Sequence, residues 1–348
     1  MYSDTSNKAE SSLSFQQKVW MVCSITALFV AIIWFFKVTF SVLLLILTGA
    51  LVALYFHGFA RIIQRKLRIS EKLALVISVI STLVIISLLL WFMGAKIQQQ
   101  VTELAKTFPL TVNNAKLQLA KTSFGQKIIE KTSSDEISNK IYSYGRSFFN
   151  STFGIFTNIY IVVFLGIFFT ISPGIYIDGF LRLIPLKAKA QTKCTLDKIG
   201  FTLTKWLKGQ IFSMVIIAVL KWIALTILGI PMAIALALIA GILNFIPNFG
   251  PLISMFPAIL IALTISINKA VVVTIVYLLL QIIEGNVITP SIQQKLINMP
   301  AALIIIAQLF MGIVSGGWGL VLATPLVAIL MVIIQEVYVK RIEAEKYK

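Results

Sequence analysis

The chain has 348 residues, of which 58% are hydrophobic and only 12% are charged, and its mean hydropathy is +0.94. Soluble globular domains carry about 25% charged residues, so this composition excludes an ordinary soluble protein and predicts an all-α polytopic membrane protein. The formal net charge of +17 is typical of basic cytoplasmic loops in membrane proteins. No base-reading motif accompanies it, so we expect no nucleic-acid partner.

Cysteine and histidine are too scarce to build a metal site. The two cysteines lie far apart in the sequence, and His57 is the single histidine. Metalloprotease, serine-hydrolase and phosphate-loop motifs are also absent from the sequence. We therefore predict no enzyme, no catalytic residue, no bound metal and no cofactor.

The first part of the chain predicts three transmembrane helices after a polar tail. Residues 1–19 form the tail, and residues 20–95 contain apolar runs near 20–36, 39–60 and 73–95. The turn 61–72 carries five basic residues against one acidic residue. Basic residues gather in cytoplasmic loops, so this turn and the N-terminus are predicted to be cytoplasmic.

Residues 96–150 predict a small extracytoplasmic helical domain, and residues 151–171 a fourth transmembrane helix. Residues 172–209 read as a basic, amphipathic cytoplasmic linker. Its apolar stripe is Leu196, Ile199, Leu203, Trp206 and Leu207. This stripe predicts a helix lying on the inner leaflet, and a solvated linker is the alternative.

Residues 210–339 are the predicted transport core, with transmembrane helices 5–8, and residues 340–348 form a cytoplasmic tail. The segment 232–267 contains the interruption "NFIPNFGP". Its two halves would form helices of about 22 and 24 Å, which are too short for a hydrocarbon core of about 30 Å. We predict a re-entrant hairpin around 244–251 besides about eight transmembrane helices, and two tilted spans with a short loop are the alternative.

Polar and helix-breaking residues of this core are the candidates for a substrate or ion pathway. They are Asn244, Pro247, Asn248, Gly250, Pro251, Lys221, Gln281, Glu284, Asn286 and Gln308. Lys221 near mid-membrane needs a partner, either Glu284 or the freed carbonyls at 247–251, unless it reaches a cavity or surface. Glu284 is a candidate proton or cation site, or an interfacial partner of Lys295. Gln308 either lines the pathway or bonds a neighbouring helix.

Other breaks in the core are predicted structural hinges. They are Pro290, Pro300, Gly316, Gly317, Gly319 and Pro325. Prolines interrupt the helical hydrogen-bond ladder and glycines allow close helix approach. Several broken segments in one half of a membrane protein are typical of a transporter site.

Four stretches carry a resemblance to a known family. They are "LKGQIF" (207–212), "GILNFIPNFGPLISMFPAIL" (241–260), "EGNVITPSIQQKLINMPAALIIIAQLFMG" (284–312) and "GGWGLVLATPLVAIL" (316–330). Residues 200–335 resemble the autoinducer-2 exporter family, also called PerM-type permeases. The resemblance implies a bacterial inner-membrane protein that exports or passes small molecules and forms homo-oligomers. Some members of that family resemble sodium–proton antiporters.

The sequence therefore predicts a permease or exporter of small polar molecules, such as autoinducer-2-like signals, driven by an ion gradient. We expect it in the bacterial cytoplasmic (inner) membrane, in contact with lipids, with both termini cytoplasmic. One alternative is a cation/proton antiporter that uses Glu284. An alternative of another class is a non-transporting scaffold that recruits partners through its extramembrane segments.

Overall fold

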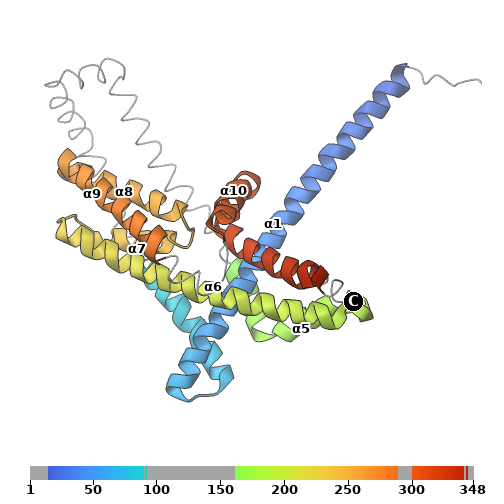
Figure 1. The fold of residues 1–348 in the computed structure, drawn as a ribbon, viewed down its shortest axis with the longest axis horizontal. Coiled ribbons are helices and arrows are strands. Elements are labelled where there is room, and N and C mark those ends of the chain that lie inside the picture. The colour runs from blue at the N-terminus through green and yellow to red at the C-terminus, as the bar shows by residue number, and fades with distance from the viewer. Residues whose placement is uncertain (1–14, 90, 92–160, 289–299, 341, 344–348) are drawn as a thin grey trace, which may run out of the picture.

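A computed structural model describes residues 15–89, 91, 161–288, 300–340, 342 and 343. The regular structure in these ranges is helical throughout, and they contain no strand (Figure 1). The predicted all-α fold is thus confirmed. In chain order the helices are α1 (Phe15–Leu67), Glu71–Leu89, Ile161–Ile171, α5 (Pro173–Arg182), α6 (Leu186–Ile227), α7 (Ala233–Leu243), α8 (Phe249–Ile265), α9 (Ile267–Ile283), the π-helix η1 (Glu284–Ile288), α10 (Ala301–Ile333) and the π-helix η3 (Ile334–Val339).

Five helices in the described ranges are long and apolar enough to cross a membrane. Helix Ile161–Ile171 and α5 would make a sixth span if they are counted together, although they meet at an 86° bend. The predicted spans 153–171 and 297–314 begin among residues that the structure does not describe. The predicted extracytoplasmic domain, 96–150, lies wholly outside the described residues.

Two of the predicted spans, 20–36 and 39–60, lie on the single helix α1. Only Lys37 and Val38 separate these two runs, and neither residue type breaks a helix. At 53 residues, α1 is about 80 Å long. Its N-terminal half stands away from the other helices in Figure 1, and Trp20 there is 75% exposed.

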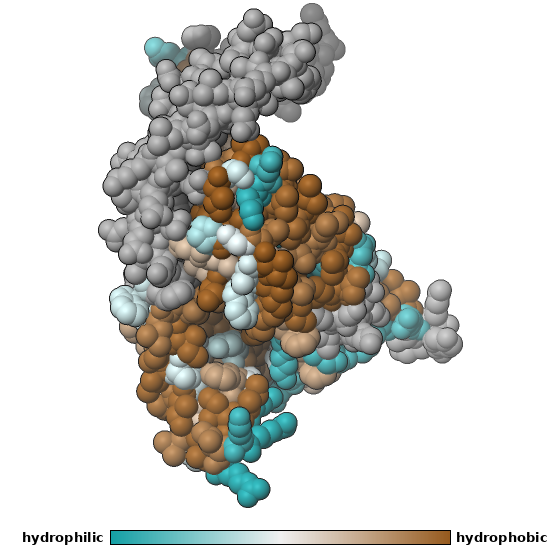
Figure 2. All heavy atoms as spheres, turned by 90° about the vertical axis from the view of Figure 1, so that its left-hand side faces the viewer, coloured by the Kyte–Doolittle hydropathy of each residue, from teal (hydrophilic) through white to brown (hydrophobic). Residues whose placement is uncertain are grey.

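Helix α1 and helix Glu71–Leu89 form a hairpin around the basic turn. Arg68, with a φ of 54°, lies at the start of the turn. Farther along, the Ser78 hydroxyl donates to the Phe56 carbonyl oxygen at 3.0 Å, and the Tyr55 and Thr82 hydroxyls are 3.3 Å apart. Figure 2 shows hydrophilic side chains gathered at the lower end of a largely hydrophobic face, which is the end where this turn lies in Figure 1.

Helix α10 consists of two segments that join at Gly316. Gly316 has φ 60° and ψ −140°, a conformation that side chains rarely tolerate. The two segments fold closely together, since a Cβ atom on Gly319 would lie 2.0 Å from the Met311 carbonyl oxygen. The predicted spans 297–314 and 320–339 thus occupy separate segments of one interrupted helix, and Pro325 lies inside the second.

Helix α6, which has 42 residues, connects two hydrophobic clusters. The first cluster joins α6 residues Leu203, Trp206 and Leu207 to α1 and α10. The second joins Leu225 near the end of α6 to α7, α8 and α9. The stripe that we predicted to lie on the inner leaflet therefore packs largely on protein, because α1 and α10 cover its C-terminal half.

Helices α1 and Ile161–Ile171 approach closely through two glycines. A Cβ atom on Gly49 would lie 2.7 Å from the Leu165 Cβ, and one on Gly166 would lie 2.4 Å from the Val52 Cγ1. Both distances are too short for real Cβ contacts, so larger residues would force the helices apart.

We predict that Gly49→Leu destabilises the protein and that Gly58→Leu on the same helix does not. A Cβ atom on Gly58 meets nothing within 4 Å. Overpacking at Gly49 should lower the free energy of unfolding by about 1–3 kcal/mol. Thermal unfolding of the purified variants in detergent measures this difference, and equal midpoints for the two variants would contradict the close helix packing.

Candidate functional site

The chain is interrupted between α7 and α8 at the predicted position. Helix α7 ends before Asn244, and α8 begins after Asn248, which has a φ of 66°. Pro247 cannot donate a backbone hydrogen bond, so the helical ladder cannot continue through it. The turn is very tight, because a Cβ atom on Gly250 would lie 1.8 Å from the Leu243 carbonyl oxygen. Only glycine fits at this position.

Side chains bond three backbone carbonyls of this break. The Gln210 Nε2 donates to the Asn244 carbonyl at 2.6 Å, and the Gln308 Nε2 donates to the Pro247 carbonyl at 2.7 Å. The Ser254 hydroxyl donates to the Pro251 carbonyl at 2.8 Å. These donors come from α6, α10 and α8 respectively. The break is therefore bonded by protein side chains, and it is partly buried: Asn244 is buried, Pro247 is half-buried and Asn248 is exposed.

The side-chain amide of Gln308 forms two hydrogen bonds with the break. Besides its bond to the Pro247 carbonyl, its Oε1 accepts a hydrogen bond from the Asn248 Nδ2 at 3.1 Å. The Gln308 side chain is completely buried. It thus fastens the first segment of α10 to the turn between α7 and α8.

Asn244 connects the break to α6 and α9. Its Nδ2 donates to the Ser213 hydroxyl at 3.2 Å, and its side chain also interacts with Glu284. Gln210 and Ser213, three residues apart on α6, lie on one face of that helix. Asn244 therefore contributes to the break through its backbone and to a group of polar residues through its side chain. We call this group the polar cluster; its members are Gln210, Ser213, Lys221, Asn244, Ser254, Tyr277, Gln281 and Glu284.

Lys221 is 1% exposed and lies inside the protein. Its Nζ donates to the Ser254 hydroxyl at 3.1 Å and lies 4.4 Å from the centre of the Tyr277 ring. Ser254 in turn bonds the Pro251 carbonyl, so Lys221 reaches the break through one hydroxyl group. Lys221 and Glu284 interact electrostatically but form no direct ion pair.

Glu284 is 5% exposed and begins the π-helix η1. Single turns of π-helix occur frequently at functional sites, where they redirect side chains. Its Oε2 has no hydrogen-bond partner in the described part of the chain. Gln281 lies one turn earlier, and its Oε1 also lacks a partner there. Lys295, the alternative partner for Glu284, is not among the described residues.

The structure does not bring the remaining predicted residues into this cluster. Asn286 is exposed and donates to the Ile282 carbonyl of its own segment at 2.9 Å. Gly316, Gly317, Gly319 and Pro325 shape α10, and Pro300 precedes its first turn. Pro290 lies outside the described residues.

Sequence reasoning missed four members of the polar cluster, namely Gln210, Ser213, Ser254 and Tyr277. Gln210 and Ser213 share a helical face with Lys221, and that spacing was the available signal. Ser254 and Tyr277 are ordinary residues for membrane helices, so their sequence positions carried no comparable signal.

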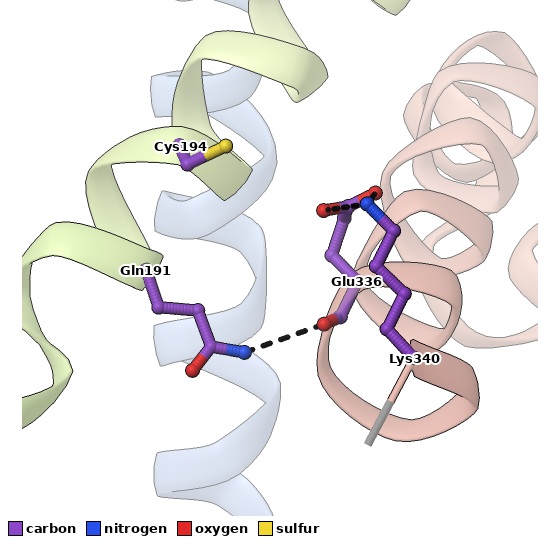
Figure 3. Close-up of a pocket in the computed structure, with 4 residues that line it drawn as sticks. All are labelled: Gln191, Cys194, Glu336 and Lys340. Atoms are coloured by element: carbon purple, nitrogen blue, oxygen red, sulfur yellow. Dashed lines mark hydrogen bonds and ion pairs between the residues drawn. The ribbon is translucent and has the colours of Figure 1, made fainter. Parts of the chain in front are cut away.

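A second polar group lies at the far end of α6, outside this cluster. Lys198 and Lys340 pair with Glu336 at 2.7 and 2.8 Å, and the Gln191 Nε2 donates to the Glu336 backbone carbonyl at 3.3 Å. Figure 3 shows Gln191 and Glu336 pointing toward each other. Together with Cys194 and Lys340 they line an open cleft of about 410 Å³. Both lysines are well exposed, and pairs of this kind contribute little energy.

Comparison of the sequence with known proteins identifies the family of this chain. Residues 23–339 match the description "AI-2E family transporter". This match covers most of the sequence. The chain belongs to the AI-2E transporter family. Like other members of this family it is a multi-pass membrane protein.

The alignments of this AI-2E transporter with individual relatives span different shares of each chain. The chain is 35% identical to YrrI of Bacillus subtilis (strain 168) over 43% of this chain and 42% of YrrI. It is 26% identical to YueF of the same strain over 52% of this chain and 50% of YueF. It is 24% identical to the AI-2 transport protein TqsA of Escherichia coli (strain K12) over 79% of this chain and 81% of TqsA. The aligned part of the chain thus spans half or less of the two Bacillus relatives.

We predict that Gln308→Met destabilises this AI-2E transporter. Methionine has a similar length but cannot bond the Pro247 carbonyl or the Asn248 amide, which would leave buried polar groups without partners. The expected loss in the free energy of unfolding is about 1–3 kcal/mol. Thermal unfolding in detergent tests it against Ile306→Met, a change at a residue of α10 that is 62% exposed. Equal midpoints would show that Gln308 does not hold the break.

Proposed function

We propose that the chain moves small polar solutes across the bacterial cytoplasmic membrane, driven by an ion gradient. The observation that carries this proposal is the partly buried break at 244–251, whose backbone carbonyls bond side chains from α6, α8 and α10. Backbone outside helices is tolerated at membrane depth only inside protein or beside a wet cavity. The segment 232–267 is on this proposal a re-entrant hairpin within the transport core, 210–339.

Transport through this core requires exchange of hydrogen bonds. In the described conformation the break is closed, because protein side chains occupy its carbonyls. A polar solute that enters must replace these bonds with its own, since buried polar groups without partners are costly. Asn248 and Gln308 are suited to this exchange, because each presents both a donor and an acceptor.

The substrate class follows from a relative and from the chemistry of the site. TqsA is named for AI-2 transport, so autoinducer-2 and similar small polar solutes are the first candidates. The amide groups of Asn244, Asn248 and Gln308 suit hydroxyl-rich solutes, which both donate and accept hydrogen bonds.

The proposed orientation follows from basic residues. The turn after α1 and the C-terminal region both carry an excess of basic side chains, which favours the cytoplasm for that turn and for the C-terminus. A cytoplasmic N-terminus requires in addition that the two apolar runs of α1 cross the membrane separately. On the same proposal, residues 96–150 lie outside the cytoplasm and the protein forms homo-oligomers.

Transport assays with proteoliposomes test the main proposal. Wild-type protein should take up one or more members of a panel of radiolabelled small polar solutes that includes autoinducer-2. Asn244→Leu should lower the initial uptake rate about tenfold or more, since it removes the polar contacts to Ser213 and Glu284. Thr274→Val is the control, because that hydroxyl bonds the Ala270 carbonyl of its own helix.

The outcomes separate the proposed functions. Uptake that Asn244→Leu leaves unchanged would remove the polar cluster from the pathway. If wild-type vesicles moved neither a solute nor an ion, the chain would instead be a scaffold that recruits partners through its extramembrane segments.

Cation/proton exchange through Glu284 is a second candidate function. The observation in its favour is a buried carboxylate with an oxygen that has no hydrogen-bond partner in the described part of the chain. Ionisable groups within membrane spans are costly and are usually functional.

We predict that Glu284→Gln abolishes proton flux driven by an imposed sodium gradient. The amide keeps the size of the side chain but cannot bind and release a proton at physiological pH. A pH-sensitive dye trapped in the vesicles reports this flux. Flux equal to that of the wild type would exclude Glu284 from ion coupling, and solute uptake measured in parallel would show whether the two activities are linked.

A further inference from the structure

Four buried oxygen atoms without hydrogen-bond partners belong to one region of the protein. They are Asn244 Oδ1, Tyr277 OH, Gln281 Oε1 and Glu284 Oε2. The side chains of Asn244, Tyr277 and Glu284 are 5% exposed or less. Buried polar atoms are normally bonded, so each exception calls for an explanation.

The positions of these residues bring them together. Tyr277, Gln281 and Glu284 follow one another at intervals of four and three residues along α9 into η1, so they lie on one side of that helix. Asn244 from α7 interacts with Glu284, and Lys221 from α6 lies over the Tyr277 ring. We call Asn244, Tyr277, Gln281 and Glu284 the oxygen cluster.

Lys221 is the cation beside the oxygen cluster. Its ammonium group interacts with Glu284 without a direct ion pair and is bonded instead to Ser254 of α8. Among the described residues, the groups facing Lys221 are the Glu284 carboxylate, the Tyr277 ring and the Ser254 hydroxyl, and of these Glu284 alone supplies negative charge. The buried site is balanced by one carboxylate and one ammonium group.

We propose that the oxygen cluster is a binding site for a monovalent metal cation and that the Lys221 ammonium group is its tethered competitor. This inference rests on the second function proposed above. A site with only oxygen donors suits hard cations. Its single carboxylate matches one positive charge, and no group of three or more His, Cys, Asp or Glu side chains that could hold a metal ion occurs in the described residues.

The competition links cation binding to the broken hairpin. A cation bound at Glu284 repels the Lys221 ammonium group, which is held on its other side by Ser254. Ser254 also bonds the Pro251 carbonyl in the first turn of α8, so movement of Lys221 changes a contact of the break. Cation binding and opening of the break therefore bias each other, and this is the coupling that a gradient-driven transporter requires.

Lys221→Met in the full-length protein tests the proposal. Methionine keeps the unbranched stem and removes the competing charge, which leaves Glu284 without a counter-ion. Thermal unfolding in detergent is recorded in sodium chloride and in choline chloride at equal ionic strength. We expect sodium to raise the midpoint of Lys221→Met more than choline does, with half-maximal effect at a concentration at least tenfold lower than in the wild type.

Two controls make this result specific. Lys221→Met combined with Glu284→Gln should lose the response to sodium, because the carboxylate is gone. Lys269→Met should not gain it, since Lys269 bonds the Leu228 carbonyl at the end of α6 and no cluster oxygen. An identical response of Lys221→Met to sodium and choline would overturn the proposal, and so would a response that survives Glu284→Gln.

A second variant tests the site should Lys221→Met fail to fold. Tyr277→Phe removes one cluster oxygen and keeps the ring under Lys221. Equilibrium binding of radioactive sodium to the purified protein should weaken at least threefold in this variant, and unchanged binding would exclude Tyr277 and contradict the proposed oxygen set.

These measurements also separate the inference from the proposed function. If Lys221→Met bound sodium but the vesicles showed neither solute uptake nor proton flux, the cation site would be supported and ion-driven transport would be rejected. Solute uptake by the wild type together with no sodium-specific response in any variant would reject the site and retain transport.

Discussion

The interruption at Pro247 and Asn248, between α7 and α8, imposes the constraint on which the rest of the structure depends. It leaves backbone carbonyls outside the helical ladder in one of the most apolar parts of the chain, where polar groups without partners are costly. Side chains of Gln210 and Gln308 bond the Asn244 and Pro247 carbonyls, and Ser254 bonds the Pro251 carbonyl in the first turn of α8. Each of these polar residues is buried and would be costly by itself, so the break and its donors depend on each other.

Helix α6 supplies part of these bonds, because one of its faces carries both apolar residues that pack and polar residues that form hydrogen bonds. Its residues Leu203 and Trp206 pack into one hydrophobic cluster, and Leu225 packs into the other. Between them the same face presents Gln210, Ser213, Ile217 and Lys221, and the successive intervals of three, four and four residues keep them in line. The long helix is therefore a rigid support that places polar groups opposite the break.

The sequence predicted the all-helical membrane fold and the position of the break, and it singled out Lys221 and Glu284 as candidates, because prolines and ionisable residues stand out against an apolar background. It did not predict the partners of the break, since the bonds from Gln210 and Ser254 depend on the register between neighbouring helices. The apolar stripe containing Leu203 and Trp206 was assigned to lipid, because packing against lipid and against protein requires the same hydrophobic pattern. The continuity of α1 follows from the absence of a helix breaker near Lys37.

Three departures from regular α-helix lie near the polar cluster. Two of them contain cluster residues or adjoin them, and the third, in α10, is connected to the break by the bonded side chain of Gln308. They are the break between α7 and α8, the π-helix that begins at Glu284, and the turn at Gly316 eight residues after Gln308. At the break and at the π-helix, side-chain bonds or unpaired groups accompany the loss of the regular helical ladder. A side-chain bond is exchanged by rotation about a few single bonds, whereas a helical ladder must break several bonds at once. The elements around the break are therefore able to rearrange while α6 remains intact, and discontinuous helices supported by intact ones are the arrangement that secondary transporters use.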